Sequence, residues 1–234
     1  MWLRIKWWFE DHRWGVVQSL WFILLALILT YPMVLQPNTY ALGSARADGM
    51  KHLWTLWWMR SSVWDYTDFP YQTDLVNYPV GMDLYPIEPL NGLVALFFPW
   101  LPLIALSNLL AIVNMALTGI VGAWFGRLLS RSRVGGFIAG TILEGSAVMA
   151  FFIHVGVGEL HHLWWLPLGL GCQLKARKTQ EWKWFFAVAA SLVGAMLSCF
   201  YLGFFLALSI LIWAILTGWK GLSIQTPKLV LQYV

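Results

Sequence analysis

Four long apolar runs constrain what this chain can fold into: residues 16–35, 107–124, 134–153 and 185–216. Each is close to or longer than the roughly 20 residues that an α-helix needs to cross about 30 Å of hydrocarbon, and the last is long enough to cross twice. The whole chain is 59% hydrophobic and 11% charged, with 17 Trp. It lacks the polar surface of a soluble globule of this length. The sequence therefore predicts an all-α polytopic membrane protein.

Basic residues mark one side of the predicted membrane. Twelve of the 15 Lys and Arg residues fall in four segments that alternate with the apolar runs, at 4–13, 127–133, 175–183 and 220–228. Short cytoplasmic loops collect Lys and Arg, so we expect both ends of the chain in the cytoplasm and the loop 36–89 outside it. Because these residues are spread over several loops, the net charge of +4 is explained by topology, and nucleic acid is not an expected partner.

We expect a single membrane domain with about six transmembrane helices. The run 185–216 is split near residues 198–201, where small and polar side chains interrupt it. Pro99 and Pro102 disfavour a continuous helix over 91–106, so this segment is predicted to be interfacial or re-entrant on the outer side, and the count is seven if it spans. The expected segments are a cytoplasmic interfacial segment at 1–15, transmembrane helices at 16–35, 107–126, 134–153, 160–174, 184–199 and 201–217, an extracytoplasmic loop at 36–89 and a cytoplasmic tail at 218–234.

The loop 36–89 carries carboxylates and indoles together. Its residues 48–64 space Leu and Trp as an amphipathic helix in the membrane interface would. Its later part is punctuated by Pro and Gly and is predicted to be built of turns. An acidic, aromatic loop beside a bilayer suggests chemistry on a polar substrate that a lipid carries. The carboxylates are Asp48, Asp65, Asp68, Asp74, Asp83 and Glu88, and the indoles are Trp54, Trp57, Trp58 and Trp64.

Asp48 is the first candidate for chemistry. It lies between Ala47 and Gly49, shortly after the first apolar run, so its carboxylate is approachable at the outer membrane face. A carboxylate there can act as a general base on an acceptor hydroxyl, or bind a divalent metal that neutralises a departing phosphate. The alternative is a helix N-cap, because Asp is favoured at that position and Asp48 opens the predicted amphipathic helix.

Glu159, His161 and His162 form a second polar cluster, at the outer end of a predicted hairpin. Glu159 and His162 are three residues apart, so a helical segment would place them on one face, where they could share a metal or form an acid–base pair. The alternative is a solvated loop with imidazoles near lipid headgroups. If a divalent metal is bound, Asp48, Glu159 and His162 are its candidate ligands.

Glu144 lies inside a predicted span, where a carboxylate costs roughly a few kcal/mol and is by default a functional group facing the protein interior or a water-filled cavity. The alternative is a protonated acid bonded to Thr141, Ser146 or a neighbouring helix.

The cations of the outer loop, Arg46, Lys51 and Arg60, can hold an anionic phosphate or pair with neighbouring carboxylates.

An Asp in the loop after the first span opens a set of residues that is spread over most of the chain. The set is Ala41, Leu42, Gly43, Asp48, His52, Leu53 and Trp54, then Asn77, Tyr78, Pro79, Gly81 and Leu84, and later Gly158–His162 leading into Trp165, Leu166, Pro167 and Leu168. In these residues the chain resembles the GT-C superfamily of polytopic glycosyltransferases.

The resemblance implies transfer of a sugar from a polyprenyl-phosphate carrier to an acceptor at the extracytoplasmic face. The catalytic Asp of this superfamily lies in the first outer loop, and Asp48 stands at the matching place, where it would deprotonate or orient the acceptor while the lipid phosphate leaves. The active cavity is expected between the loop 36–89 and the turn 156–162. The candidates for contact with phosphate or acceptor are Arg46, Lys51, His52, Glu159, His161 and His162.

Members of the superfamily usually continue through further spans, so this chain resembles the N-terminal module. Three explanations stay open: a second membrane subunit supplies the rest, the chain is a truncated product, or the module binds lipid carriers without catalysis. The rival class is a non-catalytic membrane protein, a transporter or assembly subunit that uses Glu144 as a buried polar group. A conducting path is thinly supported, because few polar residues qualify to line one: Glu144, Asn108, Asn114 and a few Ser and Thr, with Gln18, Ser19 and Thr30 in the first span.

Overall fold

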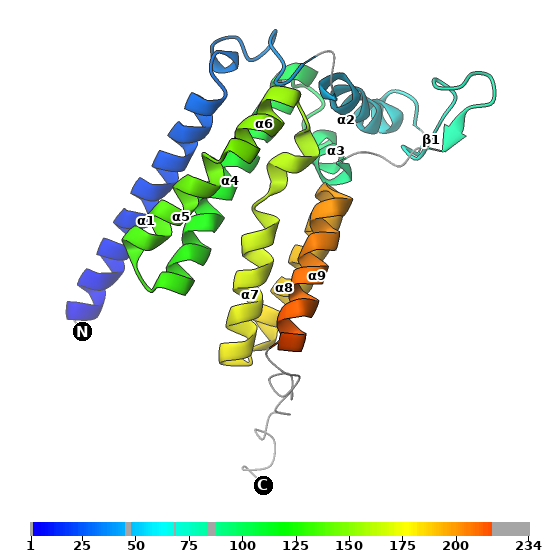
Figure 1. Ribbon diagram of the computed structural model, residues 1–234. Helices are drawn as coiled ribbons and strands as arrows, with labels where there is room; N and C mark the ends of the chain where they lie inside the picture. The colour runs from blue at the N-terminus through cyan, green and yellow to red at the C-terminus, as the bar shows by residue number, and fades with distance from the viewer. Residues whose placement is uncertain (1, 45–47, 68, 84–87, 217–234) are drawn as a thin grey trace.

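The computed structural model describes residues 2–44, 48–67, 69–83 and 88–216, and of these residues 2–12 by their backbone alone. Figure 1 shows a helical bundle with a cap of shorter elements at one end. The predicted all-α class is confirmed, because the only strands in the described ranges are the two-residue β1 (Gln72–Thr73) and β2 (Met82–Asp83), which pair antiparallel. The bundle helices are α1 (Trp2–Leu29), α4 (Leu103–Ser130), α5 (Arg133–Glu144), α6 (Ala147–Val155), α7 (Trp165–Thr179), α8 (Trp182–Ser198) and α9 (Phe200–Leu216), and the cap holds η1 (Met33–Leu35), α2 (Gly49–Trp64), α3 (Pro89–Leu96) and η2 (Gly158–His162).

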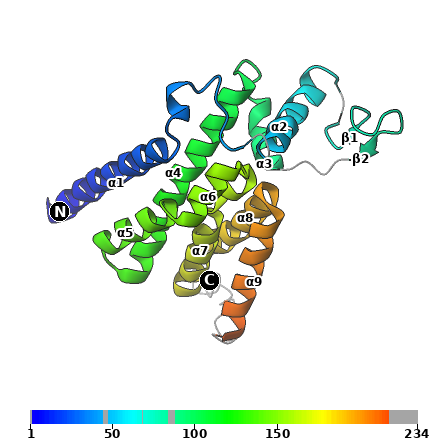
Figure 2. The same ribbon diagram turned by 45° about the horizontal axis from the view of Figure 1, so that its top comes forward.

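The bundle helices alternate in direction. Helices α1, α5 with α6, and α8 run toward the cap, whereas α4, α7 and α9 run away from it, so the start of α1 and the end of α9 lie at the end opposite the cap (Figure 1). Helix α4 is central, since it packs against α1, α5 and α7. Figure 2 shows α1 and α5 on one side of α4, and α7, α8 and α9 on the other.

Helix α1 joins two segments that the sequence analysis separated. It runs unbroken from Trp2 through the predicted interfacial segment 1–15, and it ends at Leu29 rather than at residue 35. Pro32 explains the early end, because proline lacks a backbone N–H and disfavours helical geometry in the residue before it. The chain then forms η1 and enters the cap.

The segment 91–106 is not one helix, as its prolines predicted. Helix α3 ends at Leu96, and α4 begins at Leu103 with Pro102 as its N-cap residue. The predicted span 107–126 was therefore too short, because α4 starts directly after Pro102 and continues to Ser130.

The predicted span 134–153 is broken into α5 and α6. Helix α5 ends at Glu144, and Ser146 caps α6 by accepting a hydrogen bond from the backbone N–H of Met149 at 3.2 Å. A side-chain acceptor at the first position of a helix satisfies a donor that the helix leaves unpaired. Gly145 and Ser146 therefore form a bend at the middle of this segment.

The last three helices follow the sequence prediction with one correction. The predicted span 160–174 begins too early, because residues up to His162 belong to η2 and α7 begins at Trp165. The predicted split of the run 185–216 is confirmed: α8 ends at Ser198, Cys199 has extended backbone, and α9 begins at Phe200.

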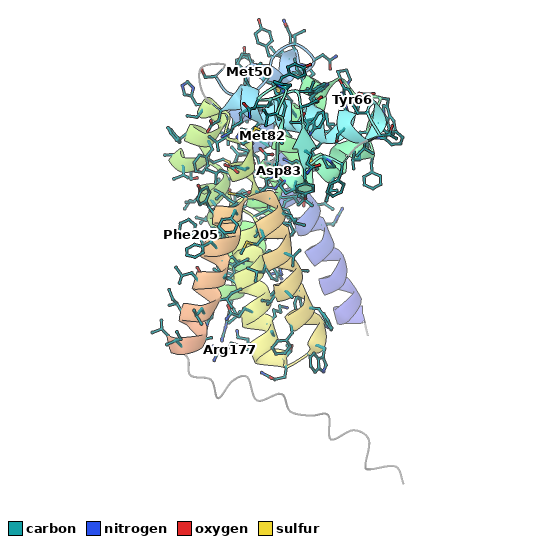
Figure 3. The ribbon with its side chains drawn as sticks, turned by 90° about the vertical axis from the view of Figure 1, so that its right-hand side faces the viewer. Met50, Tyr66, Met82, Asp83, Arg177 and Phe205 are labelled. Atoms are coloured by element: carbon teal, nitrogen blue, oxygen red, sulfur yellow. The ribbon has the colours of Figure 1, made fainter. Side chains whose placement is uncertain are left out.

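The bundle has an apolar exterior. Within the described ranges, two helical segments are long and apolar enough to cross a membrane, Leu103–Ser130 and Arg133–Val155, the second counted through its bend. Figure 3 shows Phe205 on the outer side of α9, and Arg177 at the end of the bundle farthest from Met50 in the cap. Exposed apolar side chains occur on most bundle helices, among them Leu20, Ile142, Phe186 and Phe205.

Candidate functional site

Two glycines bring the first loop against the turn before η2. Gly43 has φ +92° and Gly156 has φ +79°, a left-handed conformation that L side chains rarely adopt. A Cβ on Gly43 would overlap the Cα of Gly156, and a Cβ on Gly156 would lie 2.8 Å from the Cα of Gly43. The two backbones therefore touch, and the segments that hold the candidate residues lie side by side.

Asn108 of α4 fastens the first loop to the bundle. Its Oδ1 accepts a hydrogen bond from the backbone N–H of Leu42 at 3.2 Å. Its Nδ2 donates to the carbonyls of Pro37 at 2.8 Å and Tyr40 at 2.6 Å. Asn108 is buried, and these three hydrogen bonds use most of the donors and acceptors of its side chain. They fix the loop that leads to Asp48.

Asp48 lies at the start of α2 but does not cap it. It occupies the N-cap position, yet its side chain makes no capping hydrogen bond. Its carboxylate instead lies 3.1 Å from Nζ of Lys51, and the two side chains are 48% and 46% exposed. The capping alternative is thus not realised, and Asp48 and Lys51 form a half-exposed ion pair.

His52, one turn into α2, meets Glu88 at the start of α3. Nδ1 of His52 lies 2.5 Å from Oε1 of Glu88, at ion-pair distance. Oε2 of Glu88 accepts a hydrogen bond from Nδ2 of Asn91 at 2.5 Å. All three residues are buried, so the contact is screened from water.

Glu88 has an unusual backbone. Its φ of 55° and ψ of 52° are left-handed, a conformation that costs a residue with a side chain about 1 kcal/mol or more. Gly158 of η2 leaves the room that the carboxylate occupies, because a Cβ on Gly158 would overlap Oε1 of Glu88. The backbone of Glu88 and the missing side chain of Gly158 together place this carboxylate beside η2.

The charge on Glu88 is stabilised by its neighbours. Burial acts to raise the pKa of Glu88, but the contact with His52 and the hydrogen bond from Asn91 outweigh burial and lower it. A carboxylate that accepts such contacts stays ionised at neutral pH. The site therefore holds a buried negative charge next to an imidazole.

The two histidines of η2, His161 and His162, are buried. The alternative of a solvated loop with imidazoles near lipid headgroups is therefore not realised. Burial lowers the pKa of His161 and lowers the pKa of His162 to about 4, although Glu88 acts in the opposite direction on both. Both rings are therefore neutral at pH 7. His161 also makes a hydrogen bond with the backbone of Phe152, which fixes its ring.

Glu159, also in η2, is partly buried. Burial raises the pKa of Glu159, and the charges of Glu88 and Asp48 add to this, while His52 and Lys51 act against it. These influences show that Glu159 lies within electrostatic reach of the first loop. The structure thus brings Glu159 to the same end of the molecule as the other candidates.

The predicted cavity between the loop 36–89 and the turn 156–162 is present. It has a volume of about 40 Å³, which is room for roughly three water molecules. The polar residues that line it are His52, Glu88, Asn91, Asn114 and His161, together with Ser107 of α4.

Several buried nitrogens around the cavity have no hydrogen-bond partner in the described part of the chain. They are Nε2 of His52, Nε2 of His161, and both ring nitrogens of His162. A buried polar atom without a partner costs about 1–3 kcal/mol, so such a group needs an explanation.

A second hollow lies on the outside of the cap. It has a volume of about 560 Å³ and is lined by the β1–β2 ribbon and by α2. Tyr66 offers an exposed ring, and Asp74 and Asp83 offer carboxylates. Figure 3 shows Tyr66, Met82 and Asp83 in the cap.

Two sequence candidates, Arg46 and Arg60, are not part of this site as the structure describes it. Arg46 lies outside the described residues. Arg60 donates to the carbonyl of Leu101 at 2.8 Å, which links α2 to the turn before α4. Among the described residues no three His, Cys, Asp or Glu side chains gather in metal-binding geometry, so Asp48, Glu159 and His162 do not form a ready metal site.

Glu144 lies in the bundle, away from the cap. It is fully buried, and a Cβ on Gly119 of α4 would overlap its Oε2. Neither carboxyl oxygen has a hydrogen-bond partner among the residues that the structure describes.

The predicted local partners of Glu144 are engaged elsewhere. Thr141 accepts a hydrogen bond from Nε1 of Trp21 at 3.1 Å, and Ser146 caps α6. Neither hydroxyl bonds Glu144 in the structure, because both carboxyl oxygens lack a partner among the described residues.

Sequence reasoning named Glu88 as a loop carboxylate but did not include it, or Asn91, among the site residues. One local signal exists, since Glu88 precedes Pro89 and Pro is common at the first position of a helix. Nothing in the sequence pairs Glu88 with His52, because the two are 36 positions apart and the contact depends on the backbone of Glu88.

Comparison with protein-family models, with curated proteins and with solved structures finds no match to this chain.

Proposed function

We propose that this protein transfers a sugar from a polyprenyl-phosphate carrier to an acceptor at the extracytoplasmic face of a membrane, as a GT-C-like glycosyltransferase or its N-terminal module. The observation that supports this most is the gathering of carboxylates, a lysine and imidazoles from two distant segments at one end of an apolar bundle. Acid–base groups and a cation are what transfer from a lipid phosphate requires.

The bundle supports a membrane placement with six crossings: α1, α4, α5 with α6, α7, α8 and α9. Their exposed apolar faces suit lipid. Basic residues such as Arg177 lie at the end away from the cap (Figure 3), so the rule that places Lys and Arg in the cytoplasm puts the cap outside.

Lys51 is the proposed phosphate contact and Asp48 the proposed carboxylate for the acceptor. Both are half exposed at the start of α2, so a lipid headgroup can reach them. A lysine beside a phosphate neutralises the charge that develops on the leaving group. The described residues do not fit a metal ion, so no step is assigned to one.

The hollow on the cap is a second proposed place for a sugar, separate from the small cavity and from Asp48. Sugars stack on aromatic rings such as Tyr66 and donate hydroxyl hydrogen bonds to carboxylates such as Asp74 and Asp83. Its volume of about 560 Å³ falls in the range of small-molecule sites.

Native mass spectrometry of the protein in lipid nanodiscs tests carrier binding. The probe is decaprenyl phosphate, and phosphatidylglycerol serves as an anionic lipid of a different shape. The Lys51→Gln variant is expected to bind decaprenyl phosphate about tenfold more weakly, a loss of about 1.4 kcal/mol. Lys183→Gln is the matched control, because Lys183 also pairs with a carboxylate, Glu181, but lies at the other end of the bundle.

A transfer assay tests the activity itself. A panel of decaprenyl-phosphate hexoses and pentoses is offered with octyl glycosides as acceptors, and Asp48→Asn is expected to abolish transfer while leaving the unfolding midpoint unchanged. If no donor is consumed and decaprenyl phosphate binds no better than phosphatidylglycerol, the proposal is wrong.

Glu144 keeps the rival function open. A fully buried carboxyl without a described partner is typical of proton or ion pathways in membranes. Proton flux into proteoliposomes that is lost in Glu144→Gln, with no selective binding of decaprenyl phosphate, would favour a transporter.

A further inference from the structure

We infer that His52 is the group that removes the acceptor proton, that Glu88 is the positioning residue that holds the His52 ring, and that Asp48 only orients the acceptor. This inference rests on the proposed sugar transfer and assigns its general base.

The imidazole of His52 is paired with the carboxylate of Glu88. Nδ1 of His52 lies 2.5 Å from Oε1 of Glu88, and the second oxygen of Glu88 is held by Asn91. A carboxylate next to one ring nitrogen fixes the ring orientation and the tautomer, so that the other nitrogen, Nε2, carries the lone pair. A base arranged in this way can take a proton from a hydroxyl.

Nε2 of His52 is buried and has no hydrogen-bond partner among the described residues, and the same is true of Nε2 of His161. His52, Glu88 and His161 all line the small cavity. A hydroxyl group that enters the cavity would supply the hydrogen bond that these nitrogens lack.

Asp48 has different surroundings from His52. Asp48 is not among the residues that line the cavity, and its carboxylate already pairs with Lys51 in a half-exposed position. His52, by contrast, is buried and lines the cavity. The geometry therefore favours His52 for proton removal.

The backbone of Glu88 is strained. The left-handed backbone of Glu88 and the glycine at Gly158 serve to place one carboxylate against His52. Backbone strain at a residue other than glycine clusters at functional sites, where it is part of the arrangement of the reacting groups.

The chemistry balances without any additional reactant. The acceptor hydroxyl gives its proton to Nε2 of His52 while its oxygen forms a bond to the anomeric carbon of the sugar. The bond between that carbon and the phosphate oxygen breaks, and the electron pair leaves with the polyprenyl phosphate. His52 ends as an imidazolium next to the Glu88 carboxylate and later releases the proton to water. The cavity accepts a hydroxyl or a water molecule but not a whole sugar ring, since its volume is about 40 Å³.

The test uses the full chain in nanodiscs with the same panel of decaprenyl-phosphate sugars and octyl glycosides. His52→Gln is expected to lower kcat by a factor of about 10² to 10⁴, which is what a general base contributes, with donor binding unchanged by native mass spectrometry. His154→Gln is the matched control, because His154 is an exposed histidine of α6 near the same end. Imidazole added to His52→Ala is expected to restore part of the rate.

A second variant tests the positioning role. Glu88→Gln is expected to lower kcat without changing the KM for the donor, because the imidazolium that forms loses its neighbouring negative charge. The other ionisable groups around His52 are Asp48, Lys51, Glu159, His161 and His162, and they are left intact. Glu88→Asp is expected to recover part of the rate.

The outcomes separate the inference from the proposed function. If the wild type transfers sugar and His52→Gln keeps kcat within threefold, the assignment of His52 is overturned while the function stands. If Asp48→Asn abolishes transfer and His52→Gln keeps it, Asp48 is the base. If the wild type transfers nothing from the panel, the proposed function fails and the inference fails with it.

Discussion

The burial of His162 makes the stability of this protein depend on pH in a predictable window. Its side chain is 1% exposed, and burial lowers its pKa to about 4. The unfolded chain has an ordinary histidine pKa of about 6.5. Between these values the unfolded state binds a proton that the folded state does not, so acidification favours unfolding.

The magnitude follows from the shift. Each pH unit between the two pKa values costs about 1.4 kcal/mol. The contribution is fully present above pH of about 6.5, and about 2 kcal/mol of it is lost by pH of about 5. Glu88 acts in the same direction, since its pKa is lowered, but its contribution is lost at more acidic pH, as the pH falls through its folded pKa.

The assay is guanidinium unfolding in dodecyl maltoside micelles, followed by Trp fluorescence at pH 7.5 and pH 5. The wild type is compared with His162→Leu, which has a similar volume and no titrating group. The wild type is expected to lose about 2 kcal/mol more than the variant on acidification. His154→Gln, at an exposed position, should keep the full dependence of the wild type.

Equal pH dependence in the wild type and in His162→Leu would refute the reasoning, because it would mean that His162 is solvated or bonded in the folded state. His161 also has a pKa lowered by burial, so some pH dependence is expected to remain in the variant. The quantity that decides is therefore the difference between the two proteins.

Three further variants test the packing that builds the site. Gly156→Ala should destabilise the protein by about 1 kcal/mol or more, because its Cβ would lie 2.8 Å from the Cα of Gly43 and its φ is left-handed; a wild-type unfolding midpoint would contradict the backbone contact. Asn108→Ala should cost roughly 1–3 kcal/mol through lost loop hydrogen bonds, and it should speed proteolysis of the loop 36–44 if that loop is held as described. Glu144→Leu should leave stability unchanged or raise it, since it removes a buried carboxyl without a described partner, and a large loss measured in the same unfolding assay would show that Glu144 has a partner.

Much of the helical pattern follows from the sequence for local reasons. Apolar runs predicted helices, and the prolines at positions 99 and 102 predicted a break, because proline removes a backbone donor wherever it lies. The end of α1 before Pro32 was not predicted. The corrected boundaries were of the same kind: Ser146 caps a new helix inside a predicted span, and α1 continues through the predicted interfacial segment. A local hydropathy pattern alone does not show where each helix begins and ends.

The sequence by itself also determined which polar residues exist near the cap, and it placed a cavity between the loop 36–89 and the turn 156–162. Only the tertiary structure decided which of them meet. Asp48 pairs with Lys51 three positions away, which a helix permits locally. The contact of His52 with Glu88 depends instead on the left-handed backbone of Glu88 and on the space at Gly158. Such contacts join residues far apart in the chain, so no local spacing encodes them, and the packing of α2, α3 and η2 over the bundle creates the site.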